Sequence, residues 1–118
     1  MREVLVAAGK GEPDAVLALD VYVHRLRAGI AAMVATLGGL DGLVFTGGVG
    51  ENSSLIRRRV IEDLGFLGLL VDGDRNSDGQ GDREIGLVGV APFIAVVTAR
   101  EDLQIAREVR RLIEPGVG

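Results

Sequence analysis

The sequence predicts an α/β protein, in which helices cover the faces of a small β-sheet. Segments with apolar residues at every third or fourth position alternate along the chain with short runs of apolar, β-branched residues. The longest helical pattern covers residues 13–37, and the clearest strand patterns cover residues 43–45 and 93–97. At 118 residues the chain has the length of one domain with a modest core.

Two helices are expected before the first strand. A short one covers residues 2–8, and a long one begins near Pro13, which suits a first helical turn, and ends at Gly38. The long helix carries an apolar stripe made of Leu19, Tyr22, Val23, Leu26, Ile30, Met33, Val34 and Leu37. Its opposite side is rich in the small residues Ala18, Ala28, Gly29 and Ala32. A short sheet covers only one of these sides, so we expect the chain to form a homodimer.

A further helix is expected at residues 53–64, capped by Asn52 or Ser53. Its buried face is predicted to consist of Leu55, Ile56, Val60 and Leu64. The run Arg57, Arg58 and Arg59 is interpreted as a solvated face, or alternatively as a positive cluster that steers an anion.

The remaining elements are shorter. We expect a strand at residues 67–71, a flexible surface loop at 72–83, and weak extended structure at 84–90. After the buried strand at 93–97, Thr98 and Glu101 have the spacing of a capping box ahead of a last helix.

The most distinctive stretch lies directly after the first strand. Three glycines fall within residues 47–50, and Glu51, Asn52 and Ser53 lead into the next helix. Glycine permits a positive φ and lets a ligand approach the backbone closely. A helix start adds unpaired N–H groups and the positive end of a dipole, so this turn is a candidate seat for a phosphate or nucleotide. A tight strand-to-helix connection without a ligand explains the same residues equally well.

Composition argues against several classes of protein. The net charge is −4 and there is no basic patch with interleaved aromatics, so binding to nucleic acid or to an anionic membrane is not expected. The absence of cysteine excludes disulfides and thiolate sites and fits a cytoplasmic protein. The sole histidine, His24, is interpreted as structural, and a partial calcium-loop spacing at residues 74–85 has Ile85 where the bidentate Glu belongs.

Residues 44–53, Val-Phe-Thr-Gly-Gly-Val-Gly-Glu-Asn-Ser, resemble the Phe-Thr-Gly-Gly-Ile-Gly-Glu-Asn-Ser signature of the acetate kinase family. Residues 17–25 resemble part of the family's long helix, and residues 1–4 resemble the end of its Asp-Met-Arg element. Residues 100–106 resemble the family's Asn-Glu-Glu-Leu-x-Ile-Ala element, with Arg100 in place of Asn. The resemblance covers essentially the whole chain in the family's order.

This resemblance implies two ribonuclease-H-like domains of the actin, sugar-kinase and Hsp70 superfamily, with the active site between them. Residues 1–118 are then expected to be the C-terminal part of the second domain, a partial ribonuclease-H-like fold with a long N-terminal helix and without the N-terminal domain. The resemblance further implies that Glu101 helps to hold Mg²⁺. The residues implied to bind ATP or ADP are Arg2, Gly48, Val49, Gly50, Glu51 and Asn52.

The implied reaction is phosphoryl transfer from ATP to acetate, which gives acetyl phosphate and ADP. The arginines, the histidine and the aspartate that the family uses for this chemistry have no counterpart in these residues, so no catalytic residue is assigned and the chain is expected to be inactive alone. The alternative is a non-catalytic remnant that acts as a nucleotide-binding or dimerisation module. Acetate and propionate both remain open as substrates, because the acceptor pocket is not among these motifs.

Overall fold

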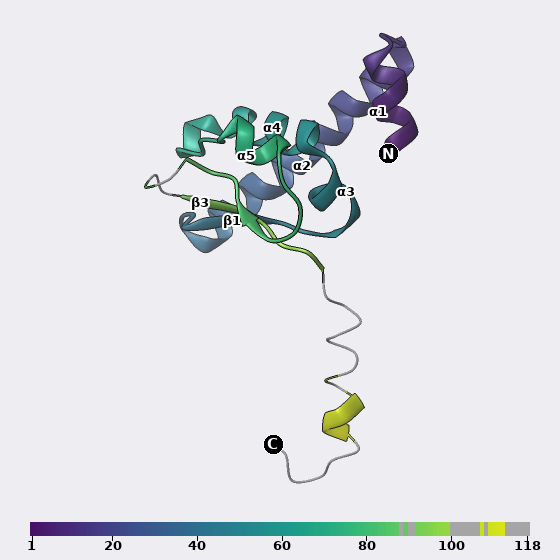
Figure 1. Cartoon of the computed structure of the whole chain (residues 1–118). Coiled ribbons are helices and arrows are strands. Elements are labelled where there is room, and N and C mark those ends of the chain that lie inside the picture. The colour runs from purple at the N-terminus through teal and green to yellow at the C-terminus, as the bar shows by residue number, and fades with distance from the viewer. Residues whose placement is uncertain (88, 90–91, 100–106, 108, 113–118) are drawn as a thin grey trace.

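The computed structural model describes residues 1–87, 89, 92–99, 107 and 109–112 (Figure 1). The predicted capping partner Glu101 and the start of the last predicted helix lie outside the described residues.

Two helices form an arm at the start of the chain. Helix α1 (Arg2–Gly9) packs against the first part of helix α2 (Pro13–Leu37). Helix α1 and this first part of α2 project away from the rest of the molecule (Figure 1). Both helices were predicted, and α2 has the predicted bounds, with proline at its start and Gly38 at φ 78° after its end. Glycine takes that left-handed conformation without strain, so the chain can turn back toward the sheet.

Among the described residues, the sheet has three strands in the order β1-β3-β2. Strand β1 (Gly42–Phe45) runs parallel to the central β3 (Phe93–Val96), with Phe45 opposite Val96, and β2 (Arg83–Glu84) is antiparallel to β3. The two clearest predicted strands are therefore confirmed. The expected extended structure near residue 84 is present as β2 and as an isolated bridge between Val71 and Gly86.

The glycine-rich stretch differs from the prediction, because it is a helix and not a turn. Helix α3 (Gly47–Asn52) begins at Gly47, whose φ of 78° turns the chain out of β1. Helix α4 (Ser54–Asp63) follows at once, and the Ser53 hydroxyl caps it by accepting a hydrogen bond from the Ile56 N–H at 3.2 Å. The predicted cap is thus confirmed. Two short helices meeting at Ser53 explain why a single periodic pattern could not be read across residues 47–64.

Three further expectations are wrong. Leu55 is 48% exposed, and its place in the buried face of α4 is taken by Ile61. Residues 67–71 are not a strand, because Leu67 ends the 3₁₀-helix η1 (Gly65–Leu67), Gly68 is left-handed and only Val71 forms a bridge. Residues 72–83 are not an irregular loop, because Asp72 caps the short helix α5 (Gly73–Ser77) by accepting from the N–H groups of Asp74 and Arg75.

The core lies where α2 and α4 pack together against the sheet. Its buried side chains come from α2, α4, the sheet and the segments that follow α4; they are Leu19, Val23, Phe45, Ile56, Val60, Ile61, Leu64, Leu69, Ile85, Ile94 and Val96. Within the described residues, no helix is both long enough and apolar enough to cross a membrane.

Candidate nucleotide site

A pocket of about 610 Å³ opens between α1 and α3. Its lining comes from two segments that are far apart in sequence: Met1, Arg2, Leu5 and Val6 on the α1 side, and Gly48, Val49, Asn52 and Ser53 on the α3 side. Most of these side chains are apolar, and Arg2 supplies a single positive charge. Such a lining suits a flat, largely apolar group with an anionic tail.

The α3 side of this pocket is shaped by its glycines. A Cβ added at Gly48 would have no atom within 4 Å, so the surface beside this residue is open. The Asn52 side-chain amide donates to the Gly48 carbonyl at 2.8 Å. This hydrogen bond spans the turn of α3 that lines the pocket. The Asn52 amide oxygen receives no hydrogen bond from the part of the chain that the structure describes, so it is available to a ligand donor.

Four of the six residues predicted to bind nucleotide therefore meet in one pocket: Arg2, Gly48, Val49 and Asn52. Gly50 and Glu51 do not line it. A Cβ at Gly50 would lie 3.5 Å from the Phe45 carbonyl carbon, so this residue faces strand β1. The Glu51 carboxylate accepts from the Ala99 N–H at 3.2 Å and lines a separate polar pocket of about 390 Å³. The nucleotide-binding roles of Gly50 and Glu51 remain predictions.

Arg57 is the main residue that the sequence interpretation missed. Its side chain is not solvated, because only 2% of the residue is exposed. It donates from Nη1 to the carbonyls of Gly50 and Glu51, both at 2.9 Å. It also donates from Nε to the Asn76 side-chain oxygen and from Nη2 to the Asn76 carbonyl, both at 2.8 Å. We call this set of contacts the Arg57 network.

The neighbouring arginines behave as the sequence predicted. Arg58 is exposed and pairs with Glu62 one turn away at 3.0 Å, and Arg59 pairs with Asp20 on α2 at 2.9 Å. Spacing alone distinguishes Arg57 from these two, since it lies three and four positions before the buried Val60 and Ile61. This spacing can be read in the sequence. Arginine is usually exposed, however, so Arg57 was assigned to the solvated face.

The electrostatics of the Arg57 network are unusual. All four of its hydrogen bonds go to neutral oxygens. Burial lowers the pKa of the Arg57 guanidinium, and the nearby positive charge of Arg83 lowers it further. Arginine nevertheless stays protonated in proteins, so the network contains a buried positive charge.

A metal centre is not formed by the described residues. No group of three or more histidine, cysteine, aspartate or glutamate side chains gathers among them. The predicted Mg²⁺ ligand, Glu101, lies outside this part of the chain, and its predicted role is untested.

Comparison with known proteins agrees with the motif resemblance. The model of the acetokinase family matches residues 1–107. The chain belongs to this family. It is 43% identical over 113 residues to the acetate kinase of Thermosynechococcus vestitus and 46% identical over 108 residues to that of Gloeobacter violaceus. These alignments cover 96% and 92% of the chain but only 27% of each relative.

Solved structures of the family share the fold. The Porphyromonas gingivalis acetate kinase matches with a TM-score of 0.86 and 33% identity, over 96% of this chain and 29% of that one. A propionate kinase from Francisella tularensis matches with a TM-score of 0.81 and 37% identity, over 91% of this chain and 27% of that one. The expected α/β fold, part of a ribonuclease-H-like domain, is therefore confirmed.

Proposed function

We propose that this acetokinase-family chain provides the nucleotide-binding wall of an acetate kinase. The reaction would be Mg²⁺-assisted phosphoryl transfer from ATP to acetate, giving acetyl phosphate and ADP, in the cytoplasm. Because the chain spans 27% of the relatives it matches, the whole activity is a proposal for the complete enzyme. We assign residues 1–118 to the C-terminal part of the second domain of that enzyme.

The observation that carries the proposal is the meeting of Arg2 with Gly48, Val49 and Asn52 in one pocket. A purine ring would lie between the apolar side chains of Leu5 and Val49, where it would be shielded from water. The free Asn52 amide oxygen would accept a hydrogen bond from an exocyclic amine of the base. Arg2 would attract the phosphates as a point of positive charge.

Mg²⁺ would neutralise charge on the phosphates of the bound nucleotide. This ion commonly binds through one or two carboxylates together with phosphate oxygens and water. A single ligand from this chain, Glu101, is therefore compatible with a site that the nucleotide itself completes.

The proposal is tested by titrating ADP into the chain in a calorimeter. Gly48→Val would place a branched side chain in the open space of the pocket without meeting another residue, so ADP binding should be lost while the fold is retained. Gly65→Val is the matched control, because it adds the same side chain to open space at the start of η1, and Gly65 does not line this pocket. Equal ADP affinity in the wild type and in Gly48→Val would contradict the proposal.

Turnover by these residues alone is not expected. Stabilising the charge on a transferring phosphoryl group usually contributes several kcal/mol, and no residue of this chain is assigned to that task. A coupled assay with ATP, Mg²⁺ and acetate should therefore show no acetyl phosphate. Steady turnover that survives repurification would show that the chain contains catalytic groups.

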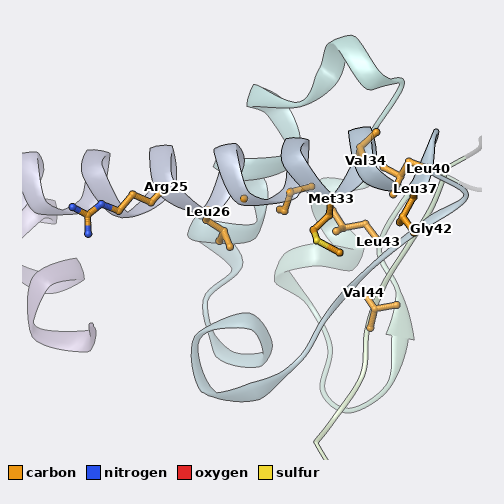
Figure 2. Close-up of a pocket in the computed structure, with 11 residues that line it drawn as sticks. Arg25, Leu26, Met33, Val34, Leu37, Leu40, Gly42, Leu43 and Val44 are labelled. Atoms are coloured by element: carbon orange, nitrogen blue, oxygen red, sulfur yellow. The ribbon is translucent and has the colours of Figure 1, made fainter.

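The second candidate function, dimerisation, is favoured by an apolar groove of about 360 Å³ between the end of α2 and β1 (Figure 2). Met33 and Leu37 on its helical side are 58% and 70% exposed, and Val44 on its strand side is 52% exposed. We propose that a second copy of the chain covers this groove, since burying apolar area gains about 25 cal/mol per Å². Light scattering should report a dimer for the wild type. Met33→Glu, which places a charge in the groove, should shift the population to monomer. A wild-type monomer at high micromolar concentration would contradict the proposed dimer.

A further inference from the structure

We propose that Arg57 is a positioning residue, which holds helix α3 in the orientation that shapes the nucleotide pocket. This inference rests on the proposed function, because it assigns the pocket between α1 and α3 to a nucleotide. The group that acts is the guanidinium of Arg57 together with its partner Asn76 on α5.

Helix α3 needs an external support. It has six residues, three of them glycine, and no residue within it is fully buried. Glycine is the poorest helix former apart from proline, and isolated short helices are marginal in water. The carbonyls at its C-terminal end also lack partners within the helix.

Arg57 supplies that support from the next helix. Two donors on its Nη1 reach the carbonyls of Gly50 and Glu51, in the last turn of α3. A positive charge at this end also complements the helix dipole. The remaining donors anchor the guanidinium to Asn76, so that α3 is fixed to α5 through one rigid, planar group.

Asn76 completes the anchor. It is 2% exposed, and its side-chain Nδ2 donates to the Ser54 carbonyl at 2.9 Å, at the start of α4. Arg83 donates to the same Asn76 carbonyl that Arg57 uses, at 3.2 Å. The Arg57 network therefore joins α3, α4 and α5 where their ends meet.

The pocket and the Arg57 network use the same turn of α3. Val49 and Asn52 line the pocket, and the two carbonyls that Arg57 holds belong to Gly50 and Glu51 between them. A lysine at position 57 keeps the charge but lacks the planar fork that reaches these carbonyls and Asn76 together. Without the fork, the turn would lose its fixed orientation and the pocket its shape.

The test compares Arg57→Lys with the matched control Arg58→Lys, whose arginine is exposed and, within the described residues, pairs with Glu62. Amide hydrogen exchange provides two probes. The Ser53 N–H donates to the Val49 carbonyl and reports on α3. The Ile85 N–H donates to the Ile94 carbonyl and reports on the core. In Arg57→Lys the Ser53 amide should exchange at least about tenfold faster while Ile85 is unchanged, and ADP affinity should fall by about tenfold. Arg58→Lys should behave as the wild type.

Asn76→Ser keeps the main-chain acceptor but removes the Oδ1 acceptor of Arg57 and the Nδ2 donor to Ser54, so it should give the same pattern to a smaller degree and serves if Arg57→Lys does not fold. The inference is overturned if Ser53 exchange is unchanged, if Ser53 and Ile85 lose protection equally, or if α3 loosens without loss of ADP affinity. Absence of ADP binding by the wild type would refute the proposed function, while the exchange data would still decide whether Arg57 holds α3.

Discussion

The two walls of the pocket are attached to the molecule in different ways. The α3 wall follows a core strand, ends at the buried Ser53 that caps α4, and is held by the buried Arg57. The α1 wall belongs to a helix with no fully buried residue, which packs chiefly on the projecting part of α2 (Figure 1). The α3 wall is therefore tied to the core by Ser53 and Arg57. The α1 wall lies on an arm, where Val4, Leu5 and Ala8 are only partly buried.

This difference suggests a division of roles. Segments with few buried contacts open at low free energy, whereas segments joined to the core open only when the fold does. We expect the α3 wall to fix where a nucleotide lies and the α1 wall to adjust to it. The contrast predicts that substitutions behind α3 alter stability and binding together, whereas substitutions of exposed α1 residues alter binding alone.

The largest effect is expected for Ile56→Ala, directly behind the α3 wall. Ile56 is 1% exposed, and truncating a buried isoleucine costs about 2–5 kcal/mol of unfolding free energy, a large share of the stability of a small domain. Urea unfolding should show this loss, and ADP binding should weaken with it. The half-exposed Leu55 on the same helix provides the control, since Leu55→Ala should change the free energy by less than about 1 kcal/mol.

A smaller effect is expected for Ser53→Ala, at the junction of α3 and α4. The substitution removes the side-chain oxygen that accepts from the Ile56 N–H, and losing such a cap costs about 1 kcal/mol. The neighbouring Ser54→Ala should be nearly neutral, because Ser54 uses only its carbonyl among the hydrogen bonds of the described residues. Equal unfolding midpoints for Ser53→Ala and the wild type would show that this hydrogen bond does not stabilise the junction of α3 and α4.

Local patterns were sufficient to predict the arm and the two main strands. The apolar period of residues 13–37, with proline at one end and Gly38 at the other, defines α2 without reference to the rest of the fold. The family elements at residues 1–4 and 44–53 also identified four residues that meet in one pocket. That prediction came from the family resemblance, because nothing in the spacing of Arg2 and Gly48 says that they are neighbours.

The errors arose where tertiary contacts override local preference. Three glycines disfavour a helix, yet α3 forms because its carbonyls are held by Arg57. An arginine is usually solvated, yet Arg57 is buried because Asn76, 19 positions later, satisfies its donors. Neither partner can be identified from its own neighbourhood in the sequence, so the Arg57 network was visible only in three dimensions.

The smallest effect is expected for Arg2→Met, on the α1 wall. Arg2 is exposed, so its attraction for a nucleotide phosphate is screened and should contribute about 0.5–1 kcal/mol to ADP binding. The loss should shrink further at high salt, and unfolding should be unaffected because α1 has no buried residue. Lys10→Met removes an exposed charge near the end of the same helix, outside the pocket, and should leave ADP affinity unchanged. If Arg2→Met instead weakened binding a hundredfold, the α1 wall would have to close as tightly over the nucleotide as the α3 wall does, and the contrast between the two walls would not hold in the bound state.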